Sequence, residues 1–145
     1  MPTRSELDAA YRATTYRIFL PEGVRDLRID IADRDLAVWV AGQGEDCWAV
    51  ATAWNPAACR LSDGENRRRQ AALEIALLEL GYEPYTGENV ADAGDWPVEE
   101  SCFVVGMGSD EAKELARKFG QNAVVCGGQD GAPRLIWVDE DQQEP

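Results

Sequence analysis

The sequence contains no histidine. This absence excludes Ser-His and Cys-His catalysis, imidazole metal ligands and histidine-based pH switches. Cysteine is scarce as well, and its four residues form no Cys-x-x-Cys pair: Cys47, Cys59, Cys102 and Cys126. Three of them, Cys47, Cys102 and Cys126, fall within strand-like apolar runs, and we expect all four thiols to be buried as small hydrophobic groups in a reducing cytoplasm.

Basic residues and long apolar runs are also lacking. The 145 residues include 14 Lys and Arg against 27 Asp and Glu, which gives a net charge of -13. This balance argues against nucleic-acid binding and fits a small ligand or a basic protein partner. No apolar run approaches ~20 residues, so we expect no membrane span, and the N-terminus lacks the apolar core of a signal peptide. We therefore expect a cytoplasmic protein.

The length and apolar content of the chain suit one globular domain. Its hydrophobic fraction of 45% is ordinary for such a protein, and its length allows a genuine core. We expect this domain over residues 1–138, followed by an acidic, disordered tail over residues 139–145.

The clearest element is a helix that begins after Ser62 and ends before Gly81. Ser62 and Glu65 have the spacing of a capping box, and Gly81 suits the left-handed residue that ends a helix. Leu73, Leu77 and Leu80 repeat at helical spacing and predict the face that packs on the core. A second long helix is predicted over residues 110–119, and a short one over residues 5–13.

Strands are predicted from apolar and β-branched runs between turn residues. They cover residues 15–20, 27–31, 36–40, 47–54, 82–85, 101–107, 122–126 and 134–138. We expect residues 36–40 and 47–54 to form a hairpin, and residues 86–97 to form a loop. The run at residues 47–54 is almost uncharged on both faces, so we expect it to be a central strand.

The order strand, helix, strand occurs twice, over residues 48–85 and 102–126. Two such units joined by a loop predict an α+β fold with a ferredoxin-like split βαβ sheet and two main helices. Extra N-terminal hairpin strands and one C-terminal strand would extend that sheet. A mixed-sheet α/β sandwich is the alternative.

Five segments, taken in order, resemble the bacterial family of proteins of unknown function DUF3293. They are T-A-W-N-P, L-S-D-G-E-N-R, L-G-Y, D-W-P-V-E-E-S and A-R-K-F-G-Q-N-A-V-V, and the similarity covers roughly residues 11–127. A tryptophan–proline motif of the family corresponds to Trp96-Pro97 here, with Glu99 or Glu100 as the matching acid. The resemblance implies a small bacterial protein and supplies no activity, substrate or catalytic residue.

Polar side chains replace apolar ones in the first two turns of the helix that follows Ser62. Asn66 lies on the stripe of the core leucines, and Arg69 and Gln70 flank it. A helix N-terminus binds anions readily, and four arginines, Arg60 and residues 67–69, gather here in a strongly acidic chain. The first candidate site therefore comprises Asn55, Ser62, Asn66, Arg69 and Gln70. The structural alternatives are a buried Asn66 that bonds a loop carbonyl and arginines that pair with neighbouring acids.

Two further groups are candidates. Asp92, Asp95, Trp96, Glu99 and Glu100 form an acidic loop that could hold a cation or act as acid and base, with Trp96 as a pocket wall. Gln121 and Asn122 follow the second long helix and could reach the first candidate site. For both groups, an ordinary solvated loop or turn is the alternative.

The sequence thus predicts a binding module for a small anion or polar metabolite at the N-terminus of the first long helix, with no cofactor. A protein-interaction domain that uses the acidic surface is the second hypothesis. A metal-assisted hydrolase that uses Asp95, Glu99 and Glu100 is the third. We expect no nucleic-acid or membrane partner.

Overall fold

The computed structural model describes residues 2–139, and the acidic tail expected at 139–145 lies outside this range except for Asp139. Within residues 2–139 the chain forms four α-helices, one short 3₁₀ helix and seven strands. The α+β class predicted from the sequence is confirmed. The elements are α1 Arg4–Arg12, β1 Thr14–Leu20, β2 Gly23–Leu27, α2 Arg34–Gly42, β3 Trp48–Ala51, η1 Pro56–Ala58, α3 Asp63–Glu79, β4 Tyr85–Ala91, β5 Glu99–Val105, α4 Ser109–Lys118, β6 Ala123–Gly127 and β7 Arg134–Trp137.

The strands form a single sheet in the order β2-β1-β4-β5-β3-β6-β7. Every neighbouring pair in this sheet is antiparallel, so the alternative of a mixed sheet is wrong. The sheet is also larger than a four-stranded split βαβ core, because β1 and β2 extend it beyond β4 and β7 extends it beyond β6. β3 lies among the central strands and is buried along its whole length, as its uncharged sequence predicts.

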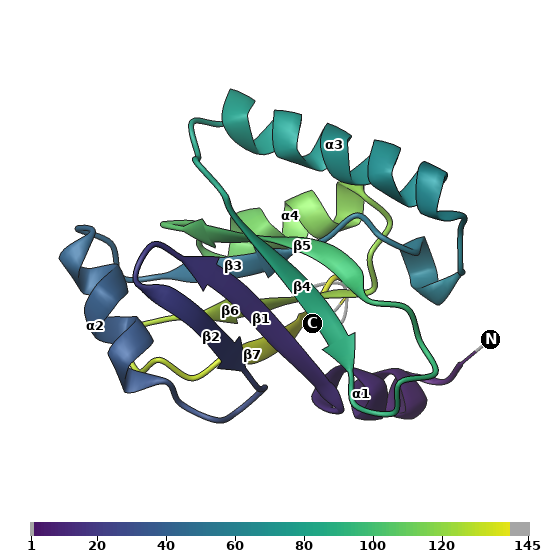
Figure 1. Ribbon diagram of the computed structural model, residues 1–145, viewed down its shortest axis with the longest axis horizontal. Coiled ribbons are helices and arrows are strands. Elements are labelled where there is room, and N and C mark those ends of the chain that lie inside the picture. Colours follow the sequence, from purple (N-terminus) through teal and green to yellow (C-terminus); the bar gives the residue numbers. More distant parts are fainter. Residues whose placement is uncertain (1, 140–145) are drawn as a thin grey trace, which may run out of the picture.

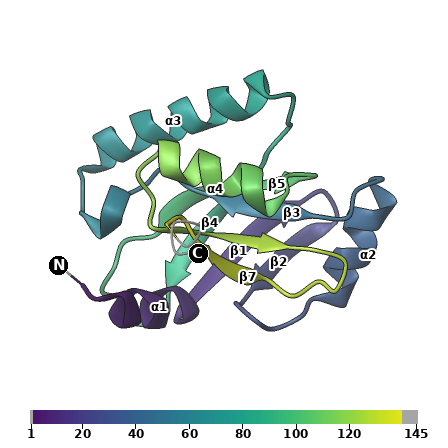
Figure 2. The same cartoon turned by 180° about the vertical axis from the view of Figure 1, so that it is seen from behind.

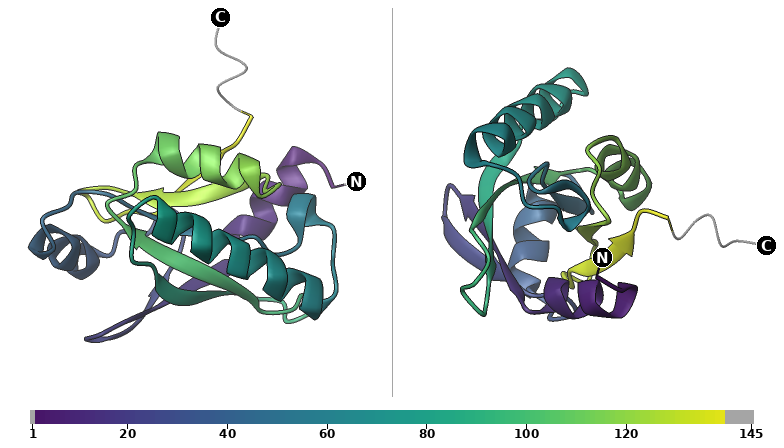
Figure 3. Two further views of the ribbon diagram at one scale, coloured as in Figure 1. Left: turned by 90° about the horizontal axis from the view of Figure 1, so that it is seen from above. Right: turned by 90° about the vertical axis from the view of Figure 1, so that its right-hand side faces the viewer.

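The sheet is strongly curled, and its two faces pack against different helices (Figure 1, Figure 2). The outer face packs against α3 and α4, with Leu73, Leu77 and Leu115 among its core residues. The inner face curls toward α2 (Figure 3, right), whose Leu36 and Val40 pack with Trp48 and other residues of the strands. α1 and α2 lie at opposite ends of the sheet (Figure 1).

The predicted strand at residues 36–40 is wrong, because this segment belongs to helix α2. The Asp33 side chain caps the helix by accepting a hydrogen bond from the Leu36 N–H at 3.0 Å. Leu36 and Val40 are one helical turn apart and both are buried, whereas Val38 between them is 71% exposed. A short apolar run fits the period of a helix as well as that of a strand, so its pattern does not distinguish the two. The cap formed by Asp33 favours the helix. The hairpin expected between this run and β3 is therefore wrong as well, and α2 is a helix that the sequence did not predict.

Strand boundaries differ from the prediction at three places. β3 ends at Ala51, three residues before the end of the strand predicted at 47–54. β4 shares only Tyr85 with the strand predicted at 82–85 and covers the first half of the expected loop. The signal that suggested a loop, Gly87, reflects close backbone approach instead, because a Cβ there would lie 2.7 Å from the carbonyl oxygen of Arg17. β2 ends at Leu27, where the predicted strand begins, because β1 and β2 form a tight hairpin with Arg17 opposite Asp26.

The cysteines follow the sequence expectation in part. Cys102 and Cys126 are buried, and burial raises the pKa of each thiol to about 12. Cys47 is half-buried. The expectation is wrong for Cys59, which is exposed because it follows the short 3₁₀ helix on the surface.

Candidate functional site

Asn66 and Gln70 are buried on the same face of α3 as Leu73 and Leu77, as their spacing predicts. Both amides bind the segment that follows β3. The Asn66 Oδ1 accepts a hydrogen bond from the Asn55 N–H at 2.8 Å, and its Nδ2 donates to the Asn55 Oδ1 at 2.9 Å. The Gln70 Oε1 accepts from the backbone N–H of residue 53 at 2.9 Å. These side chains therefore hold a loop in place through bonds within the chain.

Arg69 and Ser62 are likewise engaged by the chain itself. Arg69 donates from Nε to the Ala53 carbonyl at 2.8 Å and from Nη2 to the Phe119 carbonyl. Ser62 caps α3 by accepting from the Glu65 N–H at 3.2 Å, and its hydroxyl donates to the Glu65 carboxylate at 3.0 Å. The polar start of α3 is thus a structural junction between α3, the loop after β3 and the end of α4.

A cavity of about 420 Å³ lies close to this junction, toward the end of the sheet where α1 is found. Six strand ends meet there: the starts of β1, β5 and β6 and the ends of β3, β4 and β7. Six of the predicted candidate residues line the cavity, namely Asn55, Asp95, Trp96, Glu99, Gln121 and Asn122. Ser62, Asn66, Arg69 and Gln70 are not part of its wall.

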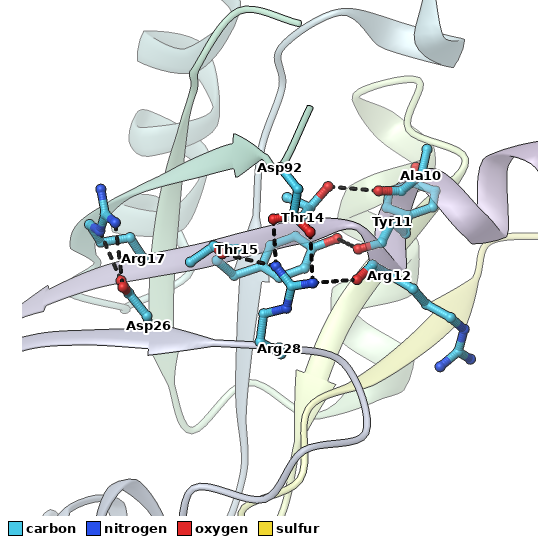
Figure 4. Close-up of polar contacts among 10 residues, drawn as sticks. Ala10, Tyr11, Arg12, Thr14, Thr15, Arg17, Asp26, Arg28 and Asp92 are labelled. Atoms are coloured by element: carbon cyan, nitrogen blue, oxygen red, sulfur yellow. Dashed lines mark hydrogen bonds and ion pairs between the residues drawn. The ribbon is translucent and has the colours of Figure 1, made fainter. Parts of the chain in front are cut away.

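Arg28, which directly follows β2, fixes the rim of this end of the sheet (Figure 4). Its two terminal nitrogens bind the Asp92 carboxylate at 2.7 and 2.8 Å. The same guanidinium donates to the Thr15 hydroxyl at 3.0 Å and to the Arg12 carbonyl at 3.2 Å. One side chain therefore joins the end of α1, the start of β1 and the end of β4.

Two hydroxyl groups of β1 add to this attachment (Figure 4). Tyr16 donates from its hydroxyl to the Tyr11 carbonyl at 2.9 Å, and Thr14 donates to the Ala10 carbonyl at 2.7 Å. The last turn of α1 is thus fixed to the sheet, and Tyr11, Thr14 and Tyr16 all line the cavity. Burial, with the nearby Glu99 carboxylate as the second cause, raises the pKa of Tyr11 to about 12. Burial, with the neighbouring Tyr11 as the second cause, also raises the pKa of Tyr16.

Glu99, the first residue of β5, is the acidic group that the structure holds most firmly in the wall. Its Oε2 accepts hydrogen bonds from the Asn55 Nδ2 and from the Trp96 Nε1, both at 2.8 Å. Burial raises the pKa of the Glu99 carboxyl, and these two hydrogen bonds oppose the rise. Glu100 pairs with Glu88 across β4 and β5 and lies on the opposite face of the sheet, because side chains alternate along a strand.

The charged side chains in the cavity wall are all acidic. Glu6, Asp95 and Glu99 line the cavity, and none of the described residues in the wall is a lysine or arginine. Most of the remaining wall is apolar or aromatic. This composition suits a neutral or positively charged group and disfavours an anion.

The acidic loop does not form a metal site within residues 2–139. No group of three or more cysteine, aspartate and glutamate side chains is placed to hold a metal ion in this part of the chain. Asp95 and Glu99 line the cavity, whereas Glu100 does not.

Within residues 2–139, no helix has both the length and the apolar composition that crossing a bilayer requires.

Sequence reasoning missed several residues of the cavity wall: Tyr11, Tyr16, Trp54 and Asn89. Asn89 falls within the loop expected at residues 86–97, whereas the structure places it in β4. The tyrosines belong to α1 and β1, whose position relative to β5 depends on strand pairing. Only the alternation of β1 carried a signal, since it places Tyr16 on the apolar face of its strand.

Replacing Glu99 by glutamine is expected to stabilise the protein at neutral pH and to have little effect near pH 4. When folding raises the pKa of a carboxyl, the folded protein loses stability as the pH rises above the pKa of 4.5 that the group has in the unfolded chain. The loss is complete once the pH exceeds the pKa in the folded protein. Glutamine carries no such proton equilibrium. Melting temperatures of both proteins between about pH 4 and 7 check this, and a difference that does not grow with pH would contradict it.

Comparison with known proteins identifies the family of this chain but gives no activity. No match to a curated protein or to a solved structure was found. The family described as "Protein of unknown function (DUF3293)" matches residues 51–124, just over half of the chain. This range contains the junction at the start of α3 and, in Trp96 and Glu99, part of the cavity wall. The match agrees with the resemblance seen in the sequence, and the chain belongs to the DUF3293 family.

Proposed function

We propose that this protein is a binding module for a small molecule, held in the cavity at the α1 end of the sheet. The observation that carries the proposal is the cavity itself, with its mainly apolar wall and its fixed Glu99 carboxylate. A volume of about 420 Å³ falls within the range typical of small-molecule pockets, and a few fixed polar groups in an apolar wall are typical of them.

The architecture explains why space remains at this end. On the inner face, Trp48, Phe103 and the residues of α2 fill the other end of the curl. We further propose that β3-α3-β4-β5-α4-β6 is a split βαβ unit, because its strands lie in the order β4-β5-β3-β6. β1 and β2 extend this unit and curl around the inner face, and α1 then lies over the cavity instead of filling it.

The polar-metabolite hypothesis fits this cavity better than it fits the N-terminus of α3. At the helix terminus, the side chains of Asn66, Arg69 and Gln70 already bond the chain itself. The arginines that favoured an anion, Arg67 and Arg68, are exposed on the surface. The proposed ligand is therefore a neutral or cationic molecule rather than an anion.

A cavity-filling variant tests this function. Ala91 lines the cavity at the end of β4, so Ala91→Phe is expected to occupy the space and remove binding. Thr86→Phe is the matched control, because Thr86 is exposed and lies on the opposite face of the same strand. The measurement is the rise in melting temperature with a panel of small aromatic and aliphatic compounds.

The expected result is stabilisation of the wild-type protein and of Thr86→Phe by members of the panel, with no stabilisation of Ala91→Phe. An equal response of Ala91→Phe would place binding elsewhere. The absence of any response in the wild-type protein would contradict the proposed function.

A further inference from the structure

The wall of the cavity contains two hydrogen-bond acceptors beside each other. Asn89 and Glu99 are directly paired across β4 and β5, so their side chains leave the same face of the sheet. The Asn89 Oδ1 is buried and has no hydrogen-bond partner among residues 2–139. Both residues line the cavity. A buried acceptor without a donor is unfavourable, and a ligand that supplies an N–H removes that penalty.

The Glu99 carboxylate is oriented for the same purpose. Asn55 and Trp96 both donate to its Oε2, and no residue within 2–139 donates to its Oε1. The two bonds fix the direction of the carboxylate while one oxygen stays available. A carboxylate that is partly removed from water binds a cation more strongly than one on the surface.

Aromatic rings from four separate segments share this wall. Tyr11 belongs to α1, Tyr16 to β1, Trp54 to the loop after β3, and Trp96 to the loop before β5. Aromatic faces attract ammonium groups, and such contacts strengthen when water is excluded. Trp54 is only 5% exposed, and its indole Nε1 has no hydrogen-bond partner among residues 2–139. The wall therefore also offers a donor for an acceptor of the ligand.

We propose that the ligand of this cavity carries an ammonium group, which Glu99 and Asn89 bind through its N–H groups while the aromatic side chains surround its apolar part. This inference rests on the proposed function and adds the chemical class of the ligand. The negative charge of the cavity wall supports an ammonium ligand, since Glu6 and Asp95 line the same cavity as Glu99.

Matched probe compounds test the inference. Three series are built on the same small aromatic and aliphatic frames and end in an aminomethyl, a hydroxymethyl or a carboxylate group. Affinities are measured at constant ionic strength by calorimetry or by NMR titration. We expect the amines to bind the wild-type protein at least about tenfold more tightly than the alcohols, and the carboxylates more weakly than both.

Variants separate the Glu99 contact from the general negative charge. Glu99→Gln removes the charge while keeping the shape of the side chain, and is expected to reduce the amine affinity about tenfold with little change for the alcohols. Glu100→Gln is the control, because it removes the same charge one residue away on the opposite face of the sheet. We expect it to leave both affinities unchanged.

Each outcome has one meaning. Alcohols that bind as tightly as amines, or equal losses in Glu99→Gln and Glu100→Gln, would overturn the ammonium inference. In that case, alcohol binding that Ala91→Phe abolishes would leave the proposed function in place. The absence of binding in all three series would overturn both.

Discussion

Replacing Asn66 by leucine is expected to lower the free energy of unfolding by about 1–3 kcal/mol. Leucine suits a buried helix position beside Leu73, so the loss comes from hydrogen bonds and not from helix formation. The change leaves the Asn55 N–H without the acceptor that it has at 2.8 Å. It also removes the Asn66 Nδ2, one of two donors to the Asn55 Oδ1, so that only the Leu61 N–H remains. Asn55 is itself 3% exposed, so water cannot readily replace those bonds. Urea denaturation measures the difference.

Arg67→Ala is the control for this variant, since Arg67 is the next residue of α3 and is exposed. We expect its stability to stay within about 0.5 kcal/mol of the wild-type protein. The double variant Asn66→Leu, Asn55→Ala is expected to lose less stability than the sum of the single variants, because both changes remove the hydrogen bond from the Asn66 Nδ2 to the Asn55 Oδ1. Unchanged stability of Asn66→Leu would show that Asn66 is not the structural amide described above.

Replacing Gly127 by alanine is expected to lower the free energy of unfolding by about 1–3 kcal/mol through overpacking. Gly127 is paired directly with Trp48 across β3 and β6. A Cβ at this position would lie 2.1 Å from an indole carbon of Trp48, a side chain with 0% exposure. The indole has no free space into which to move, because the core around it is closely packed.

Gly128→Ala is the matched control, since a Cβ there would have its nearest contact, the Asp46 carbonyl oxygen, at an ordinary 3.9 Å. Neither glycine has a positive φ, so backbone strain does not distinguish them. We expect the control to unfold at the wild-type urea concentration. Equal stability of the two variants would contradict the steric role assigned to Trp48.

Local signals in the sequence were enough to predict α3. Its serine cap, its leucine spacing and the glycine that follows it all act within one or two turns. The same spacing correctly predicts that Asn66 is buried with Leu73 and Leu77. It is wrong for Leu80, which is 53% exposed at the end of the helix. Strands β1, β5, β6 and β7 were also located to within about two residues, the usual uncertainty of element ends.

Local signals failed where two structures fit the same short pattern. The five apolar residues ending at Val40 suit a strand as well as a helix, and only the Asp33 cap distinguishes them. Gly87 is locally typical of a turn, but in the structure it permits the close approach of β1 and β5 to β4. Such approach depends on partners far away in the sequence, which a local pattern does not contain.

The same limit of local signals applies to the candidate site at the start of α3. The sequence indicated that Asn66, Arg69 and Gln70 are unusual for a core-facing helix, but it did not identify their partners. The structure shows that they bond the chain from Ala53 to Asn55 and the end of α4. Whether an amide on a core face meets a ligand or a loop is decided by the backbone that folds against it.

By itself, the sequence determined the α+β class, the long capped helix, the exclusion of histidine chemistry and the family. These features depend on composition and on periodicity over a few turns. Only the tertiary structure decided the order of the strands, the curl of the sheet and the cavity. The wall residues come from positions as distant as Tyr11, Asn89 and Asn122, and they share one space because non-local strand pairing brings six strand ends together.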